Sequence, residues 1–380
     1  MFHTKFNFLH VVFFCLLFSS NGSLFAQIDN SFLSNDITVN ETDSGKLGFN
    51  ITVFNFLRNT EYFNNIELGR TLFGYQVSPS FSFQPTGKIK IQAGVFIRTD
   101  FGGETKVIPT FTLKTKHNNL EMLFGTLEGA TSHQIIEPMF DIASAIEKRI
   151  ENGFQLKYKK PKTFFDVWLN WEKFIERNSP FKEQFTAGLN YTQLLNKTTS
   201  KLKVYTVLQG MLSHSGGQID ADLTNKLTMR ANTAFGLKTS YEINKNQKIN
   251  FDAYWLGYND TGDTLVFNNI SYGWNINYGA AIFSNISYQY NNFQFMLSYF
   301  DGSTFLSPRG TAIYQCQSID NPKYTLPSRS LLIPRLMYNK TLFNQVQMSA
   351  RFEPVIDIND NFYDYSYSFY LKYYFEKIFK

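Results

Sequence analysis

The sequence predicts an all-β fold: a transmembrane antiparallel up-and-down β-barrel of about 16 strands. Three observations predict it. Apolar and polar residues alternate along many segments, which places them on opposite faces of β-strands. The links between these segments are alternately short and long, as in membrane barrels. Phe, Trp and Tyr make up 17% of the chain, yet no apolar run after the N-terminus approaches the roughly 20 residues of a transmembrane helix.

Residues 1–26 are expected to form a signal peptide. Lys5 precedes an apolar core at residues 8–18, and Ala26 is a small residue just before the expected cleavage site. Removal of this segment leaves Cys316 as the single cysteine. We therefore expect no intramolecular disulfide.

Residues 27–45 are polar and mildly acidic and show no periodicity, so we expect a periplasmic N-terminal segment there. A small plug inside the barrel is the alternative, but it would need more residues. The barrel is then expected to occupy residues 46–380. The formal net charge of +5 is too small to indicate a nucleic-acid partner.

Sixteen alternating runs are expected to be strands. They lie near residues 47–53, 73–83, 89–97, 107–113, 120–124, 154–158, 165–171, 185–191, 202–208, 231–241, 249–255, 286–290, 293–299, 330–343, 346–357 and 363–375. The third run is the clearest, because Ile91, Ala93 and Val95 point to one face and Lys90 and Gln92 to the other. The region 260–280 does not show a clear pattern.

Short links built from turn-forming residues are expected on one side of the barrel: 85–87, 117–119, 160–161, 244–246, 291–292 and 344–345. Longer links are expected on the other side: 59–69, 129–150, 213–228, 260–278 and 302–328. Short periplasmic turns and longer external loops are typical of outer-membrane barrels. An even number of strands returns both termini to the periplasm.

The last run alternates aromatic residues with polar ones from Tyr363 to Phe375, and Phe379 is the second-last residue. This stretch resembles the C-terminal strand of bacterial outer-membrane β-barrel proteins, and the Asn- and Lys-rich, aromatic composition resembles Bacteroidota barrels. In that family the last strand closes the barrel and is recognised by the insertion machinery. The resemblance implies a Gram-negative cell outer membrane, contact with outer-membrane lipid and with the barrel-insertion machinery during biogenesis, and it permits a homo-oligomer.

The layout also resembles general porins, whose third external loop folds into the lumen and narrows it. The link 129–150 is the third long link here. The resemblance implies that its acids, Glu137, Asp141 and Glu147, form a constriction loop. A surface loop with an external helix is the alternative.

Eight charged residues that alternation places on the inward face are expected to line the pore: Arg98, Lys114, Glu121, Arg230, Lys238, Asp252, Arg335 and Arg351. Basic residues outnumber acidic ones among the inward positions. Fixed positive charge attracts anions, so we expect mild anion preference in an open channel.

The leading hypothesis is a porin-like channel for passive diffusion of small polar or anionic solutes. The first alternative is a barrel with a closed lumen that acts as a surface-binding or structural module; the second is a lipolytic barrel enzyme. Ser132-His133 and Ser213-His214 are adjacent in sequence, but a catalytic triad is defined by geometry. We expect no enzyme activity, no cofactor and no metal site.

Overall fold

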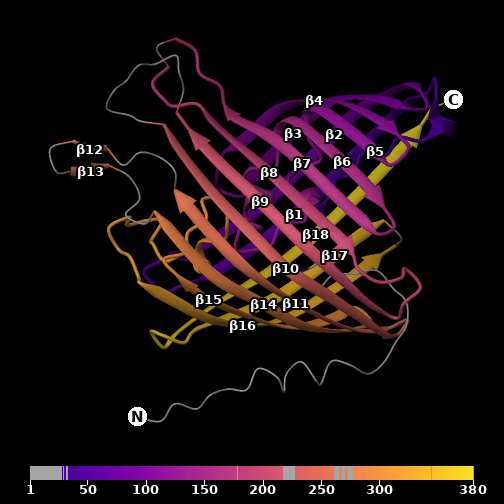
Figure 1. The fold of residues 1–380 in the computed structure, drawn as a ribbon. Helices are drawn as coiled ribbons and strands as arrows, with labels where there is room; N and C mark the ends of the chain where they lie inside the picture. Colours follow the sequence, from indigo (N-terminus) through magenta and orange to yellow (C-terminus); the bar gives the residue numbers. More distant parts are fainter. Residues whose placement is uncertain are drawn as a thin grey trace, which may run out of the picture.

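The computed structural model describes residues 28, 30, 33–177, 179–216, 227–260, 265–267, 270–272, 277–343 and 345–379. The expected signal peptide lies outside these residues. Sixteen strands close into one barrel, tilted across the view of Figure 1. This confirms the predicted antiparallel barrel and its strand count.

The barrel strands are β1 (Leu47–Glu61), β2 (Arg70–Thr86), β3 (Ile89–Asp100), β4 (Thr105–His117), β5 (Leu120–Thr126), β6 (Asn152–Lys160), β7 (Thr163–Lys173), β8 (Gln184–Leu194), β9 (Leu202–Ser215), β10 (Thr228–Asn244), β11 (Gln247–Asp260), β14 (Tyr278–Tyr290), β15 (Phe293–Ser303), β16 (Ser328–Leu342), β17 (Val346–Asp357) and β18 (Phe362–Ile378). A separate two-stranded sheet is formed by β12 (Leu265–Phe267) and β13 (Ile270–Tyr272). The short helices are η2 (Glu41–Asp43), η3 (Ala130–His133), α2 (Ser144–Glu147) and η4 (Ala312–Tyr314).

Each strand of the barrel pairs with the next one along the chain, except that β11 pairs with β14 because β12 and β13 lie in the link between them. β1 and β18 close the barrel from Gly48 opposite Ile378 to Glu61 opposite Tyr365. The twelfth barrel strand, which the sequence left unclear, is β14. Closure satisfies the backbone donors and acceptors that bilayer hydrocarbon cannot.

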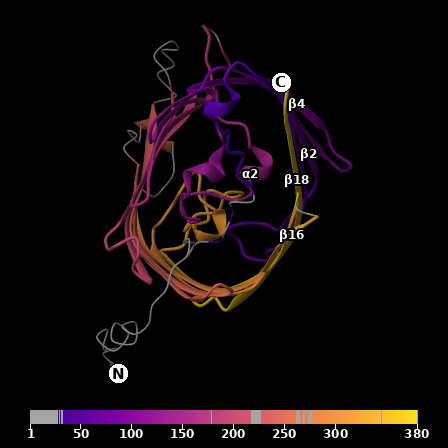
Figure 2. The same ribbon diagram turned by 90° about the vertical axis from the view of Figure 1, so that its right-hand side faces the viewer.

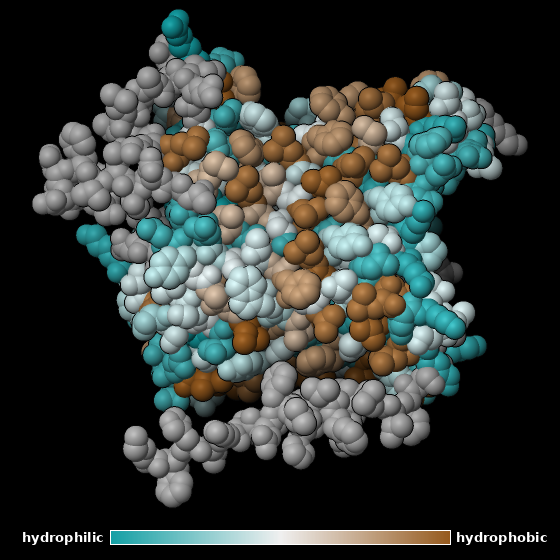
Figure 3. All heavy atoms as spheres, in the orientation of Figure 1, coloured by the Kyte–Doolittle hydropathy of each residue, from teal (hydrophilic) through white to brown (hydrophobic). Residues whose placement is uncertain are grey.

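The two faces of the strands differ as alternation predicts. Along β15, Phe293, Phe295 and Leu297 are exposed, whereas Met296 and Ser298 are buried toward the lumen. Figure 3 shows apolar side chains spread over the outer face of the strands, with hydrophilic ones more frequent toward the ends. Among the described residues, no helix has the length and apolar character needed to cross a bilayer.

Segments from outside the wall fill the lumen. Figure 2 looks along the barrel and shows α2 and part of the link between β15 and β16 inside the ring of strands. Leu306, Ile313 and Tyr314 of that link are buried in one hydrophobic cluster with Phe283 and Phe300 of the wall. The lumen therefore contains an apolar core.

The N-terminal segment differs from its expected periplasmic position. Leu33 is buried in a second cluster, against Phe54 and Tyr370 of the wall and Ile146 of α2. The wall offers an apolar patch inside the barrel, and burying Leu33 there removes both surfaces from water. Residues 33–40 thus form part of the filling of the lumen, together with the two long links.

Lysine at an outward and an inward position of β3 should have different costs. Val95→Lys places a charge on the lipid-facing side in mid-strand and should lower the free energy of unfolding by about 2–4 kcal/mol. Gln92→Lys, on the inward face beside a water-accessible cavity, should cost much less. Urea unfolding midpoints in lipid vesicles measure the cost of each substitution. Equal midpoints for the two variants would contradict the outward position of Val95 and the inward position of Gln92.

Candidate functional site

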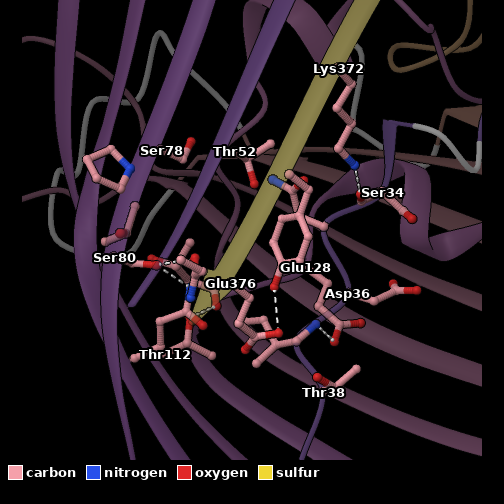
Figure 4. A pocket seen from close by; sticks show the side chains of 18 of the residues that line it. Ser34, Asp36, Thr38, Thr52, Ser78, Ser80, Thr112, Glu128, Lys372 and Glu376 are labelled. Carbon is pink, nitrogen blue, oxygen red and sulfur yellow. Dashed lines mark hydrogen bonds between the residues drawn. The ribbon is translucent and has the colours of Figure 1, made fainter. Parts of the chain in front are cut away.

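A cavity of about 670 Å³ lies at the end of the lumen that carries the short turns, which in outer-membrane barrels is the periplasmic end. Figure 4 shows Ser34, Asp36 and Thr38 of the N-terminal segment on one side of it, with Thr52 and Ser80 on the wall. Most of the residues that line it are polar or charged.

Glu128, at the start of the link between β5 and β6, anchors that link beside this cavity. Its carboxylate accepts hydrogen bonds from Lys114 Nζ at 2.7 Å and Lys157 Nζ at 2.5 Å. Burial raises the pKa of Glu128, but Lys157 and Lys114 outweigh burial and bring the pKa down to about 2. The backbone N–H of Ile37 donates at 2.9 Å to Glu128 Oε1, the oxygen that Lys114 also contacts.

A second cavity, of about 600 Å³, lies at the external end; we call it the external pocket. Six basic residues line it: Arg98, Lys106, Lys148, Arg149, Lys173 and Arg309. Three acidic residues line it: Glu147, Glu151 and Glu172. Its apolar lining includes Phe96, Ile108, Phe140, Trp168 and Trp171. The pocket combines a surplus of positive charge with aromatic surface.

The two cavities meet at Arg149 and Ile150, which line both. The Arg149 guanidinium donates to the backbone oxygen of Leu33 at 2.5 Å and to Gln76 Oε1 at 3.4 Å, and it lies 5.6 Å from the centre of the Phe54 ring. Burial lowers the pKa of Arg149 to about 10. Arg149 and the N-terminal segment thus separate the external pocket from the periplasmic cavity.

His133 lies at the inner edge of the external pocket. Its Nδ1 is 2.8 Å from Asp166 Oδ2 and its Nε2 is 2.9 Å from Glu151 Oε2. Its ring stacks on Trp168 with centroids 3.6 Å apart. Burial lowers the pKa of His133, but the two carboxylates outweigh burial and raise it above 6.5. His133 therefore holds η3 against the wall, and the two carboxylates favour its protonated form.

This geometry does not form a serine triad. Among the described residues, no hydroxyl group hydrogen-bonds to the His133 ring, since both ring nitrogens face carboxylates. His214 stacks on Phe185 and bonds to the backbone oxygen of Gly216. His117 lies exposed at the end of β4. Neither Ser-His pair seen in the sequence brings its members together for nucleophilic catalysis.

The predicted constriction acids lie inside the barrel. Glu137 is 2.8 Å from Arg335 on β16 and accepts a hydrogen bond from Tyr314 at 3.0 Å. Glu147 is 2.8 Å from Arg70. Asp141 lies 3.9 Å from Arg70 and accepts a bond from the Ala143 backbone N–H at 2.9 Å.

The eight predicted wall residues are not brought together in one ring, and most are paired. Arg98 bonds to Asp100, Lys114 to Glu121 and Glu128, Arg230 to Asp260, and Arg335 to Glu353 and Glu137. Lys238 lies opposite Asp252 in the strand register, and Asp252 accepts a bond from Asn285. Arg351 donates to Asn30 and lies over the Tyr370 ring. Arg98 alone of these lines the external pocket.

Sequence reasoning missed the residues that close the lumen. Arg149 and Arg309 lie in non-periodic links, where the sequence pattern does not indicate which way a side chain points. Arg309 pairs with Glu172 of β7 and donates to Thr186 of β8. The signal available for the N-terminal segment was the apolar pair Phe32-Leu33 within an otherwise mostly polar stretch.

Removing the Arg149 side chain should open a path between the two cavities. The wild-type protein should show little steady conductance in a planar bilayer, and Arg149→Ala should show more, because no other described side chain lines both cavities except Ile150. Lys148→Ala is the matched control, since Lys148 lines only the external pocket. A large steady conductance in the wild type would contradict the closed lumen.

His133 should stabilise the fold in a pH-dependent way. The raised pKa means that its stabilisation is complete below about pH 6.5 and is lost as pH rises through the higher folded-state pKa. His133→Asn should cost about 3 kcal/mol at acidic pH and less in alkaline solution. Denaturation midpoints across pH measure this. His117→Asn, at an exposed position, is the control, and a pH-independent difference for His133→Asn would contradict the charged-imidazole assignment.

Solved structures share this fold. A loop-deletion mutant of OmpT, an outer membrane protein of Vibrio cholerae, superposes with a TM-score of 0.51 at 12% identity, covering 88% of this chain and 100% of that chain. A substituted OccD1 (OprD) superposes with a TM-score of 0.50 at 11% identity, covering 90% and 100%. At these identities the likeness shows the fold alone: an outer-membrane barrel. No curated protein matches the chain.

A family profile gives more than the fold. The profile of the lipid A 3'-O-deacylase-type family matches residues 39–380, which include every barrel strand. The expectation that the protein is not an enzyme is therefore contradicted, because the family is described by an enzymatic activity. The sequence carried no catalytic motif that could have indicated it. The chain belongs to the lipid A 3'-O-deacylase-type family.

Proposed function

We propose that this protein is an outer-membrane ester hydrolase that removes an ester-linked acyl chain from a phosphorylated, acylated glycolipid of the lipid A type. The observation that carries the proposal is the family match over residues 39–380. In the reaction, water attacks the ester carbonyl, the bond from the acyl carbon to the sugar oxygen breaks, and the products are a fatty acid and a free hydroxyl group.

The external pocket supports this substrate class. Its six basic against three acidic residues favour a phosphorylated head group, because charge of one sign in a cleft concentrates ligands of the other. Its aromatic and aliphatic lining, including Phe96, Ile108 and Trp168, suits a hydrocarbon chain. Its position at the external end lets a lipid of the outer leaflet reach it.

Glu151 is the candidate general base. It lines the external pocket, and His133 binds it through Oε2 alone at 2.9 Å. Among the described residues, no donor bonds to its Oε1, so a water molecule can approach that oxygen. Asp166 holds the opposite side of His133 and fixes the ring. In this arrangement Glu151 takes a proton from the attacking water, and the nearby positive groups stabilise the developing oxyanion.

The closed lumen makes passive diffusion the weaker interpretation. A diffusion channel needs a continuous aqueous path, whereas Arg149, Leu33 and Phe54 separate the two cavities. The buried Glu137–Arg335 pair adds a second attachment of the link to the wall. The same closure is compatible with a hydrolase that works at the external mouth and needs no through-path.

Hydrolysis can be measured with purified protein in vesicles that contain a lipid A-type glycolipid. Mass spectrometry should detect a free fatty acid and a glycolipid lacking one ester-linked chain. Glu151→Gln should lower the rate by about 10²-fold or more, and Glu376→Gln, at the periplasmic end beside Lys90, should retain it. No product from correctly folded wild-type protein would overturn the proposed function; full activity of Glu151→Gln would overturn the assigned base.

A further inference from the structure

The barrel wall has a notch above the external ends of β5 and β6. β4 pairs with β3 up to Thr105, but its pairing with β5 begins only at Thr112, opposite Gly125. Residues 105–110 therefore have no barrel strand on one side, whereas the Phe111 backbone N–H donates to Thr126 Oγ1 of β5. At about 3.3 Å per residue this free edge is on the order of 20 Å long. β7 borders the notch on its other side, since its pairing with β6 ends at Asn170.

Gly125 marks the point where the wall ends. Its φ of +96° is a conformation that favours glycine, and a Cβ atom there would lie 2.2 Å from the backbone oxygen of Phe111. Beyond it the chain leaves the wall and enters the lumen, where Ile136 and Met139 are fully buried. The link between β5 and β6 thus fills the lumen and leaves the wall open.

The outer surface around the notch is apolar. Val107 is 61% exposed, Phe111 50% and Phe124 63%, and all three point away from the lumen. Hydrocarbon cannot satisfy the free backbone groups of the β4 edge, so an edge at this depth has to face water or polar head groups. The notch therefore lies where the acyl chains and head groups of the outer leaflet meet.

The external pocket reaches both borders of the notch. Lys106 and Ile108 of β4 line the pocket from one border, and Trp171 and Lys173 of β7 from the other. The lining continues inward to Trp168. Among the described residues, no acidic side chain pairs with Lys106 or Lys173 within 4 Å. Two lysines that form no ion pair with a described residue thus stand beside an apolar path.

We propose that the notch is a lateral binding site for one anionic lipid of the outer leaflet. A phosphate group binds Lys106 and Lys173, and one acyl chain enters past Ile108 toward Trp168. The site rests on the proposed function for its role, because it brings an ester-linked chain from the membrane to the external pocket and to Glu151.

Photo-crosslinking tests the entry of the acyl chain. Benzoylphenylalanine is placed at Ile108, at its outward neighbour Val107 and at inward Gln92 of β3, in vesicles of phosphatidylcholine with phosphatidic acid. Val107 should give lipid adducts, because it faces the bilayer, and Gln92 should give none, because it lines the periplasmic cavity. Adducts at Ile108 support the notch, whereas adducts at Val107 alone overturn it.

Lysine substitutions test the anionic head group. Lys106→Gln with Lys173→Gln should lower the yield of phosphatidic acid adducts at Ile108 by roughly fivefold or more, and leave phosphatidylcholine adducts unchanged. Lys116→Gln with Lys160→Gln removes the same charge at the periplasmic ends of β4 and β6 and should have no effect. An equal yield of both lipids in every variant would overturn the recognition of a phosphate group.

The two proposals fail separately. Lipid adducts at Ile108 do not depend on hydrolysis, so they should persist in Glu151→Gln. A protein that releases fatty acid but gives no adducts at Ile108 would retain the proposed function and refute the notch. A protein that gives the adducts but releases no fatty acid would retain the notch and refute the hydrolase.

Discussion

The structure depends on the requirement that backbone polar groups within a bilayer be hydrogen-bonded by the protein itself. Pairing of β1 with β18 meets this requirement for both ends of the sheet. With both edges joined, alternation along each strand sets one apolar face toward lipid and one polar face toward the lumen. Beside β4 the described wall has a free edge, which faces the external pocket instead of another strand.

A barrel of sixteen strands encloses more space than its inward side chains fill, so the lumen needs further material. Segments that supply it include residues 33–40, the link between β1 and β2, the link between β5 and β6, and the link between β15 and β16. Apolar contacts hold part of this filling in place, since Tyr314 and Ile146 are fully buried. Buried ion pairs attach it to the wall as well. Arg335 sits between Glu137 and Glu353 and bonds to both, because a lone buried charge would be costly.

Most of the fold could be predicted from the sequence because alternation is a local property of each strand. In the run from Ile89 to Ile97, alternation alone indicates which side chains point outward, without knowledge of the adjacent strands. The short polar links indicate the turns. The filling of the lumen could not be predicted in this way. Leu33 meets Phe54 and Tyr370 across the barrel, and no period in the chain records such a contact.

The candidate site also depends on contacts between distant segments that the sequence pattern does not predict. Alternation along the run at residues 165–171 places Asp166 on the inward face. Its partner His133 lies in a non-periodic link, and Glu151 follows at the end of that link. Adjacent Ser132 suggested a hydroxyl nucleophile, whereas the fold places carboxylates on both ring nitrogens of His133. The expectation of no enzyme activity followed from the absence of a motif, and the family match shows that such an absence is weak evidence.

The link between β5 and β6 joins these features into one arrangement. The residues of this link leave the wall after Gly125, so no strand pairs with the external end of β4. The same residues enter the lumen, where Arg149 bonds to the backbone oxygen of Leu33 and closes the barrel. The same link carries His133 and Glu151 to the inner edge of the external pocket. The free edge beside β4 and the contact that separates the two cavities are therefore two consequences of one chain path. In the proposed lateral site, a ligand enters from the membrane side and needs no channel across the barrel.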